Sequence, residues 1–294
     1  MSFFDKFPQF LFSGLTTGSI YGLIAIGFGV VHNASGIMNL AQCEFVTLGG
    51  MTTVTFYAFL GIPLAISIPL AIITVTFLGA LFERLAIQPA RSKQILILTF
   101  ITIGASFFFR GLALIIWGSD PFIIPSFLSD TPIHTFRATI LPQYLWIFAI
   151  TISVVILLYL FFRRTITGKA MRAASCNRRA AALVGISVNR MVLFSFALSG
   201  GTGAVAGIII APITTTSYEI GFMLGLKGFS AAVLGGYGSM PGAILGGLLL
   251  GVMESLTAGF ISSAYKNVLS FIILLLVLFL RPSGLLGQRE AERV

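Results

Sequence analysis

The chain has 294 residues, of which 57% are hydrophobic and 9% are charged, and its mean hydropathy is +1.02. This composition excludes an ordinary soluble globular domain. The net charge of +9 does not require a nucleic-acid partner, because basic residues gather in the cytoplasmic loops of membrane proteins and fix their orientation.

Continuous apolar segments follow one another along the chain. A helix needs roughly 20 apolar residues to cross a hydrocarbon core about 30 Å thick. The runs do not alternate between apolar and polar residues as the strands of a membrane barrel would. The sequence therefore predicts a single all-α polytopic membrane domain over residues 1–294, with about eight transmembrane segments. They are expected at residues 10–31, 37–60, 62–82, 95–117, 139–162, 191–212, 225–258 and 266–280.

The first segment is predicted to stay in the protein as a transmembrane helix. Its apolar run extends past Val31 and has no small-residue cleavage site after a short apolar region, as a cleavable signal peptide would.

A polar interruption, "SGIMNLAQCEFVTLGG", begins the second segment and brings Asn39, Gln42 and Glu44 together in an apolar context. A carboxylate inside a membrane costs several kcal/mol unless it is paired or hydrated. One interpretation is that these three residues and Phe45 line a translocation pathway. The alternative for Glu44 is a structural role near a helix N-terminus, where acids are favoured.

The loop at residues 163–190 concentrates positive charge and contains no acid. The positive-inside bias places it in the cytoplasm. Arg110 lies roughly two turns before the end of its own segment, so its long side chain is expected to extend its charge towards the membrane surface. The basic residues of the loop are Arg163, Arg164, Lys169, Arg172, Arg178, Arg179 and Arg190.

A second interruption, "GGYGSMPG", divides the long segment 225–258. A hairpin with a short first arm would keep the tail bearing Arg281, Arg289 and Arg293 on the side of the basic loop. Broken helices survive at membrane depth where protein or a water-filled cavity surrounds them, and transporters often place them beside the substrate. Lys227 and Ser230 on the short arm are therefore predicted pathway residues, with an interface role left open for Lys227.

Several smaller features complete the expectation. "FVTLGG" at residues 45–50 resembles "AAVLGG" at 231–236, which indicates a possible internal repeat, as in many transporters. Glycines at helical spacing, such as Gly14, Gly18 and Gly22, predict close helix packing. Glu254, late in its segment, is expected at the outer interface.

The sequence contains none of the "GxSxG", "HExxH" or P-loop patterns, so we expect no catalytic residue and no metal site. Cys43 and Cys176 are expected to be free thiols.

Ordered motifs along nearly the whole chain resemble the membrane subunits of branched-chain amino acid ABC importers of the high-affinity leucine/isoleucine/valine type. The resemblance covers the opening helix, the first interruption, the basic loop, the second interruption and the tail. These stretches read "GLTTGSIYGLIAIGFGVV", "GIMNLAQCEF", "GKAMRAASCNRRAAALVGI", "GLKGFSAAVLGGYGSMPGAILGGLLLGVMES" and "RPSGLLG".

The resemblance implies a permease subunit of the bacterial cytoplasmic membrane. It implies a second permease subunit, two ATPase subunits that bind ATP and Mg²⁺, and a periplasmic solute-binding protein, with no cofactor in this chain. "RAAALVG" matches the family's E-A-A-x-x-x-G coupling helix, in which a small-residue face docks on the ATPase and a glycine provides a left-handed cap. Flanking arginines would bind anionic headgroups or acidic partner surface. The implied coupling residues are Arg172, Asn177, Arg179, Ala180, Ala181 and Gly185.

Two departures from the family pattern concern specificity. Cys43 stands where a glycine is expected, and a thiol there could reshape the solute route. The solutes that relatives transport, namely urea, short amides and aromatic acids, therefore stay open as alternatives. Arg179 stands where the acid is expected. An ion-coupled secondary transporter using Glu44 and Glu254 is the alternative of a different class, and a scaffold that transports nothing fits the two interruptions poorly.

Overall fold

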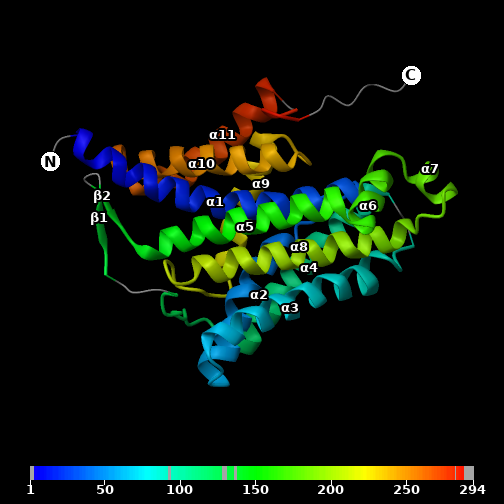
Figure 1. Cartoon of the computed structure of the whole chain (residues 1–294), viewed down its shortest axis with the longest axis horizontal. Coiled ribbons are helices and arrows are strands. Elements are labelled where there is room, and N and C mark those ends of the chain that lie inside the picture. The colour runs from blue at the N-terminus through cyan, green and yellow to red at the C-terminus, as the bar shows by residue number, and fades with distance from the viewer. Residues whose placement is uncertain (1–2, 92–93, 128–130, 136–137, 282, 288–294) are drawn as a thin grey trace.

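The computed structural model describes residues 3–91, 94–127, 131–135, 138–281 and 283–287. Its elements form a bundle of roughly aligned helices with one short β-hairpin (Figure 1). The helices and strands are α1 (Phe3–Ser35), α2 (Gln42–Val54), α3 (Leu64–Phe82), α4 (Ile95–Trp117), β1 (Ile133–Thr135), β2 (Ala138–Ile140), α5 (Pro142–Arg164), α6 (Ile166–Cys176), α7 (Arg178–Leu183), α8 (Val188–Ile210), α9 (Ile220–Gly235), α10 (Met240–Phe260) and α11 (Lys266–Leu280).

The predicted all-α membrane class is confirmed. Within the described residues, seven helices are long and apolar enough to cross a membrane: α1, α3, α4, α5, α8, α10 and α11, the last with the short turn before it. The second expected segment is instead the buried helix α2, prolonged by a π-helical turn at Thr55–Phe59. The short hairpin β1–β2 was not predicted, and it is held against α1 by two hydrogen bonds between Gln9 and Thr139.

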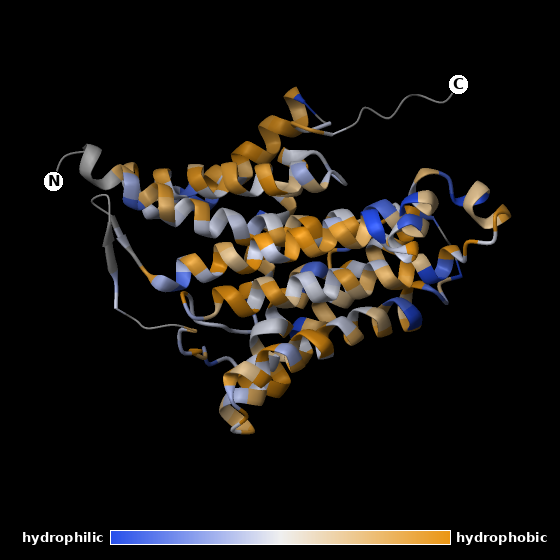
Figure 2. Cartoon of the chain, viewed as in Figure 1, coloured by the Kyte–Doolittle hydropathy of each residue, from blue (hydrophilic) through white to orange (hydrophobic). Residues whose placement is uncertain are grey.

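Helices α1, α2 and α8 form the buried centre of the bundle, and α3, α4, α5 and α11 surround them with mostly exposed apolar side chains. Figure 2 shows these outer helices as largely hydrophobic, while hydrophilic residues gather near α6 and α7 at one end. An apolar surface that faces lipid needs no protein cover, so the periphery matches a membrane-embedded chain.

Close contact between α1 and α10 confirms the predicted role of the spaced glycines. A Cβ added to Gly18 would lie 2.7 Å from the carbonyl oxygen of Gly247, and one added to Gly251 would lie 2.4 Å from the Cα of Gly18. The two backbones therefore touch. In lipid such van der Waals contact is the main attraction between helices, because the lipid tails are as apolar as the side chains.

The second interruption is a sharp reversal between α9 and α10. Gly236 and Gly238 have φ of +106° and +89°, values that glycine adopts without steric cost. Ser239 caps α10 by accepting a hydrogen bond from the backbone N–H of Gly242. The predicted hairpin is confirmed, with a first arm of 16 residues, about 24 Å of helix.

The tail returns to the same end of the bundle as this reversal. The backbone N–H groups of Leu285 and Leu286 donate to the carbonyls of Leu234 and Gly235, the last residues of α9. Asn33, at the end of α1, donates to the carbonyl of Gly238. The tail, the reversal and the basic loop thus share one end, as expected. Arg289 and Arg293 lie outside the described residues.

The internal repeat stays a prediction. Its two stretches lie in the short buried helices α2 and α9, which pack together. The paired glycines are interior to α2, whereas in the second stretch Gly235 ends α9.

Adding a methyl group between α1 and α10 should destabilise the protein. We expect Gly18→Ala and Gly251→Ala each to cost about 1–3 kcal/mol, as overpacking of a close contact does. Gly104→Ala on α4 is the matched control, because an added Cβ there meets no atom within 4 Å and alanine favours the helix. Thermal unfolding in detergent measures all three, and an equal melting temperature for Gly18→Ala and Gly104→Ala would contradict the contact.

Candidate functional site

The chain enters α2 through an irregular segment whose backbone is satisfied by a side chain of α4. Gly36, with φ of +70°, turns the chain away from α1. The Thr102 hydroxyl then accepts from the N–H of Leu40 at 3.1 Å and donates to the carbonyl of Met38 at 3.0 Å. Because irregular backbone at membrane depth needs partners within the protein, Thr102 holds the first interruption in place.

The amides of Asn39 and Gln42 meet Ser199 of α8 in the core. Asn39 Nδ2 donates to the Ser199 hydroxyl at 3.4 Å, and that hydroxyl donates to Gln42 Oε1. Gly27 and Gly203 leave room for the Gln42 amide, since a Cβ at Gly27 would lie 2.1 Å from Gln42 Nε2. The three polar side chains are fully buried, and they join the interruption to α8.

Glu44 and Arg110 form a buried ion pair between α2 and α4. Arg110 Nη2 lies 2.7 Å from Glu44 Oε1, which also accepts from the Ser106 hydroxyl at 2.9 Å. The Arg110 guanidinium lies over the ring of Phe222, 4.1 Å from its centroid. The expectation that Arg110 extends its charge towards the membrane surface is wrong, because the guanidinium is directed to the buried Glu44 carboxylate, although 20% of the Arg110 side chain stays exposed.

Glu44 also occupies the first turn of α2, so its predicted position near a helix N-terminus is confirmed. A hydrogen bond from Thr47 to Glu44 at 3.4 Å, and one from the N–H of Gly221 to Thr47 at 3.1 Å, continue the network to α9. The carboxylate thus links α2, α4 and α9.

A second buried ion pair links α9 to α10 and α1. Lys227 Nζ lies 2.6 Å from Glu254 Oε1, and the Tyr21 hydroxyl donates to Glu254 Oε2 at 2.9 Å. Glu254 was expected at the outer interface, and that expectation is wrong. The lysine and its carboxylate neutralise each other inside the protein, where an isolated charge would be costly.

The six predicted pathway residues all lie inside this chain, each with at most 5% of its surface exposed. Phe45 packs in an aromatic cluster with Phe82, Phe109 and Phe196, and the Ser230 hydroxyl donates to the carbonyl of its own helix. The structure brings four of them into the two ion-pair networks and the Asn39–Gln42 cluster. Their role in translocation stays a prediction.

Cys43 is buried between α2 and α9. A Cβ at Gly225 would lie 2.2 Å from the Cys43 sulfur, so Gly225 provides the space that the thiol fills. Cys43 therefore replaces the glycine of the family pattern by filling the space beside Gly225, and its side chain does not project into an open cavity. Both Cys43 and Cys176 are free, as predicted.

The basic loop folds into two short helices, α6 and α7, joined by Asn177. Asn177 caps α7 by accepting from the N–H of Ala180 at 3.0 Å. At the other end, the N–H groups of Gly185 and Ile186 donate to the carbonyls of Ala182 and Ala181, and Gly185 has φ of +85°. This is the left-handed glycine cap that the family resemblance implied.

Helix α7 is attached to the bundle by one face and exposes the other. Ala181 is buried against the core, and Arg178 Nη2 donates to the carbonyl of Ala34 at the end of α1, 2.9 Å away. Partial desolvation there lowers the pKa of the Arg178 guanidinium, which still carries its charge at neutral pH.

The free face of α7 carries apolar side chains that the sequence analysis missed. Leu183 is 89% exposed, and Val184 beside it is exposed too. The signal was present in the sequence, since these two apolar residues immediately precede the capping glycine. Ala180 and Arg179 are also exposed, whereas Arg172 lines a cavity between α6 and α1.

Comparison with known proteins gives a consistent result across nearly the whole chain. A family model for the permease component of branched-chain amino acid transport systems matches residues 10–278. The high-affinity branched-chain amino acid transport permease protein LivH of Salmonella typhimurium is 35% identical, over 99% of this chain and 99% of that protein. BraD of Pseudomonas aeruginosa, named for the same activity, is 36% identical over 97% of both chains.

More distant proteins are similar to this chain in sequence or in fold. The ribose import permease protein RbsC of Haemophilus influenzae is 26% identical, over 87% of this chain and 80% of that protein. A solved structure of PsaBC from Streptococcus pneumoniae superposes with a TM-score of 0.52 at 14% identity, covering 94% of this chain and 93% of that one. This last likeness concerns the fold alone.

Removing one partner of the Lys227–Glu254 pair should destabilise the protein more than removing both charges. Lys227→Met leaves a buried carboxylate unpaired, which costs about 3–5 kcal/mol. In Lys227→Met/Glu254→Gln the charge is gone and the amide oxygen can still accept from Tyr21. We therefore expect the double variant to melt at a higher temperature than Lys227→Met. Lys266→Met at the exposed start of α11 is the control, and strictly additive shifts would argue against the pair.

Proposed function

The chain belongs to the family of branched-chain amino acid transport permeases, and from this membership we propose that it forms a translocation pathway for branched-chain or other hydrophobic amino acids in a binding-protein-dependent ABC importer. The observation that carries this proposal is the match of residues 10–278 to the family, together with full-length relatives named for that transport.

The proposed assembly contains this subunit, a second permease subunit, two ATPase subunits and a periplasmic solute-binding protein in the bacterial cytoplasmic membrane. ATP and Mg²⁺ belong to the ATPase subunits, and this chain contributes no catalytic residue. Two permease subunits together would enclose the solute route. The candidate pathway residues are buried in this chain, so they would shape the face that borders the route instead of contacting the solute directly.

The α2–α4–α9 network supports such a route. Arg110 is the member of the network that reaches the surface, with 20% of its side chain exposed, and the Phe107 and Phe222 rings flank its guanidinium. Arg110 bonds Glu44 through Nε and Nη2, so the Nη1 donors of its guanidinium are left to bond a solute carboxylate, and the two aromatic rings suit an apolar side chain. We place the pathway along this face, with Glu44 setting the position of the guanidinium.

An ion-coupled secondary transporter receives less support. Its candidate ion sites were Glu44 and Glu254, and each carboxylate already has a basic partner within 2.7 Å. A carboxylate held by an arginine or lysine has no free charge to attract a transported cation. Urea, short amides and aromatic acids remain alternative solutes of the same importer family.

Coupling to ATP hydrolysis is assigned to α7 and its caps. Ala181 and Arg178 on its attached face would transmit a movement of α7 to α1. Its free face presents Leu183 and Val184 to an ATPase. An energy source moves such an equilibrium only if the two states bind the partner differently. The hydrogen bond from Arg178 to Ala34 and the contacts of α7 with α6 and α8 are the connections through which that difference would reach the bundle.

Purification of the subunit from its native membrane in mild detergent, followed by mass spectrometry, tests the proposal. Two P-loop ATPases and a second permease in fixed ratio are expected. The assembly would then be reconstituted with its binding protein, and uptake of leucine compared with uptake of urea and acetamide. A subunit that remains alone under cross-linking would contradict the importer, and uptake of urea without leucine would contradict the solute class.

A charge on the free face of α7 should uncouple transport while leaving the subunit folded. Leu183→Asp is expected to lower ATP-driven uptake at least tenfold, because a buried interface charge costs more than about 1.4 kcal/mol. Its melting temperature should match wild type, since Leu183 has no packing to lose. Ile123→Asp, 78% exposed in the loop between α4 and α5, is the matched control and should transport normally.

Gly185→Pro should have the same effect through the backbone, because proline requires φ near −65° and cannot donate to Ala182. Uptake at the wild-type rate in both Leu183→Asp and Gly185→Pro would remove α7 from the coupling route.

A further inference from the structure

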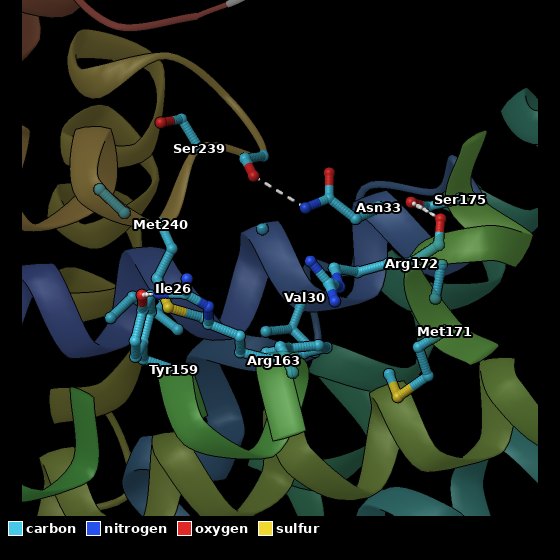
Figure 3. A pocket seen from close by; sticks show the side chains of 15 residues that line it. Ile26, Val30, Asn33, Tyr159, Arg163, Met171, Arg172, Ser175, Ser239 and Met240 are labelled. Carbon is cyan, nitrogen blue, oxygen red and sulfur yellow. Dashed lines mark hydrogen bonds between the residues drawn. The ribbon is translucent and has the colours of Figure 1, made fainter. Parts of the chain in front are cut away.

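A cavity of about 420 Å³ lies at the end of the bundle that carries the basic loop. It opens between the last turns of α1 and α5, helix α6 and the start of α10 (Figure 3). Its walls are largely apolar, formed by Ile26, Val30, Phe162, Met171 and Met240. The volume lies within the range of small-molecule sites in proteins.

The cavity lies at the boundary between the apolar and polar parts of three membrane spans. Helix α1 ends at Ser35, α5 ends at Arg164, and α10 begins at Met240. The lining residues come from the turns next to these ends, so the deep part faces the apolar level and the mouth faces the charged loop. In a bilayer, this is the depth at which acyl chains meet headgroups.

Two basic side chains, on α5 and α6, give the cavity a positive charge. Arg163 of α5 and Arg172 of α6 both line it, and no acid does. Figure 3 shows the Arg172 side chain extending from α6 towards Asn33 and Val30 of α1.

The charge of these two arginines is not neutralised by the described part of the chain. Arg163 donates to the neutral Tyr159 hydroxyl and lies 5.6 Å from the centroid of its ring, and no described side chain forms a salt bridge with Arg172. Two guanidinium groups with free donors match a phosphate, which accepts hydrogen bonds from arginine in a fork geometry.

The start of α10 adds to this positive potential. Ser239, at the N-cap, and Met240 line the cavity, so the positive end of the helix dipole is directed to the same place. The contribution is secondary to that of the arginines, but it has the same sign.

We propose that this cavity binds one anionic phospholipid, with the phosphate between Arg163 and Arg172 and an acyl chain along Ile26, Val30 and Met240. An apolar wall ending in two unpaired cations is complementary to an anionic amphiphile. A free phosphate would use the cations but not the wall, and an acidic side chain of a partner subunit would reach the mouth but not the apolar depth.

A lipid in this position would connect the coupling helices to the bundle. Arg172 lies on α6, which continues into α7 through Asn177, while Val30 and Met240 belong to α1 and α10. The lipid would therefore reinforce the attachment that Arg178 makes between α7 and α1, and it would respond to the composition of the inner leaflet.

Lipid binding to the purified importer assembly tests this site, with native mass spectrometry of titrations with phosphatidylglycerol and with phosphatidylcholine. Phosphatidylglycerol is expected to bind more tightly. Arg163→Gln and Arg172→Gln should each weaken it about fivefold, since one basic residue near anionic lipid contributes about 1 kcal/mol. Arg164→Gln, the neighbouring arginine that does not line the cavity, is the matched control and should bind like wild type.

A second variant separates the site from general charge effects. Ser175→Trp fills the mouth of the cavity from an exposed position and keeps both arginines, and it should also weaken phosphatidylglycerol binding. Equal binding of the two lipids, or wild-type binding by Arg163→Gln/Arg172→Gln, would overturn the proposal. Displacement of the lipid by inorganic phosphate alone would assign the site to free phosphate, and cryo-electron microscopy density for an ATPase acid in the cavity would assign it to the partner.

Discussion

Polar groups inside a membrane must find their partners within the protein, and this constraint explains how the helix interruptions and the buried charges are arranged. Two of the places where the backbone leaves helical geometry are the interruptions, residues 36–41 and, at the end of the bundle that carries the basic loop, residues 236–239. Thr102 satisfies the first, while Asn33 and the Ser239 cap satisfy the second. Each interruption therefore depends on a helix that is distant in sequence, so the breaks hold the bundle together instead of weakening it.

The charged side chains obey the same constraint and stabilise the same helices. Glu44 pairs with Arg110, and Glu254 pairs with Lys227. Both pairs involve the short buried helices α2 and α9, which are also the helices next to the interruptions. A chain that transports solutes needs polar residues at membrane depth, and mutual neutralisation is the way in which this one keeps them there at low cost. Movement of α2 or α9 during transport would alter these pairs first.

The coupling end combines firm attachment with exposed surface. Arg178 and Ala181 bind α7 to the bundle, while Leu183 and Val184 remain free for a partner. The proposed lipid cavity lies beside the same helices, so ATPase, lipid and solute route would meet within a few turns of α1. Glycines allow this crowding, since α1 packs against α10 with their backbones in contact.

The sequence by itself determined the membrane class, the extent of most spans, both interruptions and the hairpin, and its resemblance to a family added the glycine cap at Gly185. These follow from local properties: apolar length, glycine and serine backbone preferences, and the charge of a loop. Only the tertiary structure decided that Arg110 turns inward to a carboxylate 66 residues away, that Glu254 is buried, and that Ala181 faces the core. The physical reason is that helices in lipid can be apolar on every face, so the hydrophobic pattern does not encode their rotation or their neighbours.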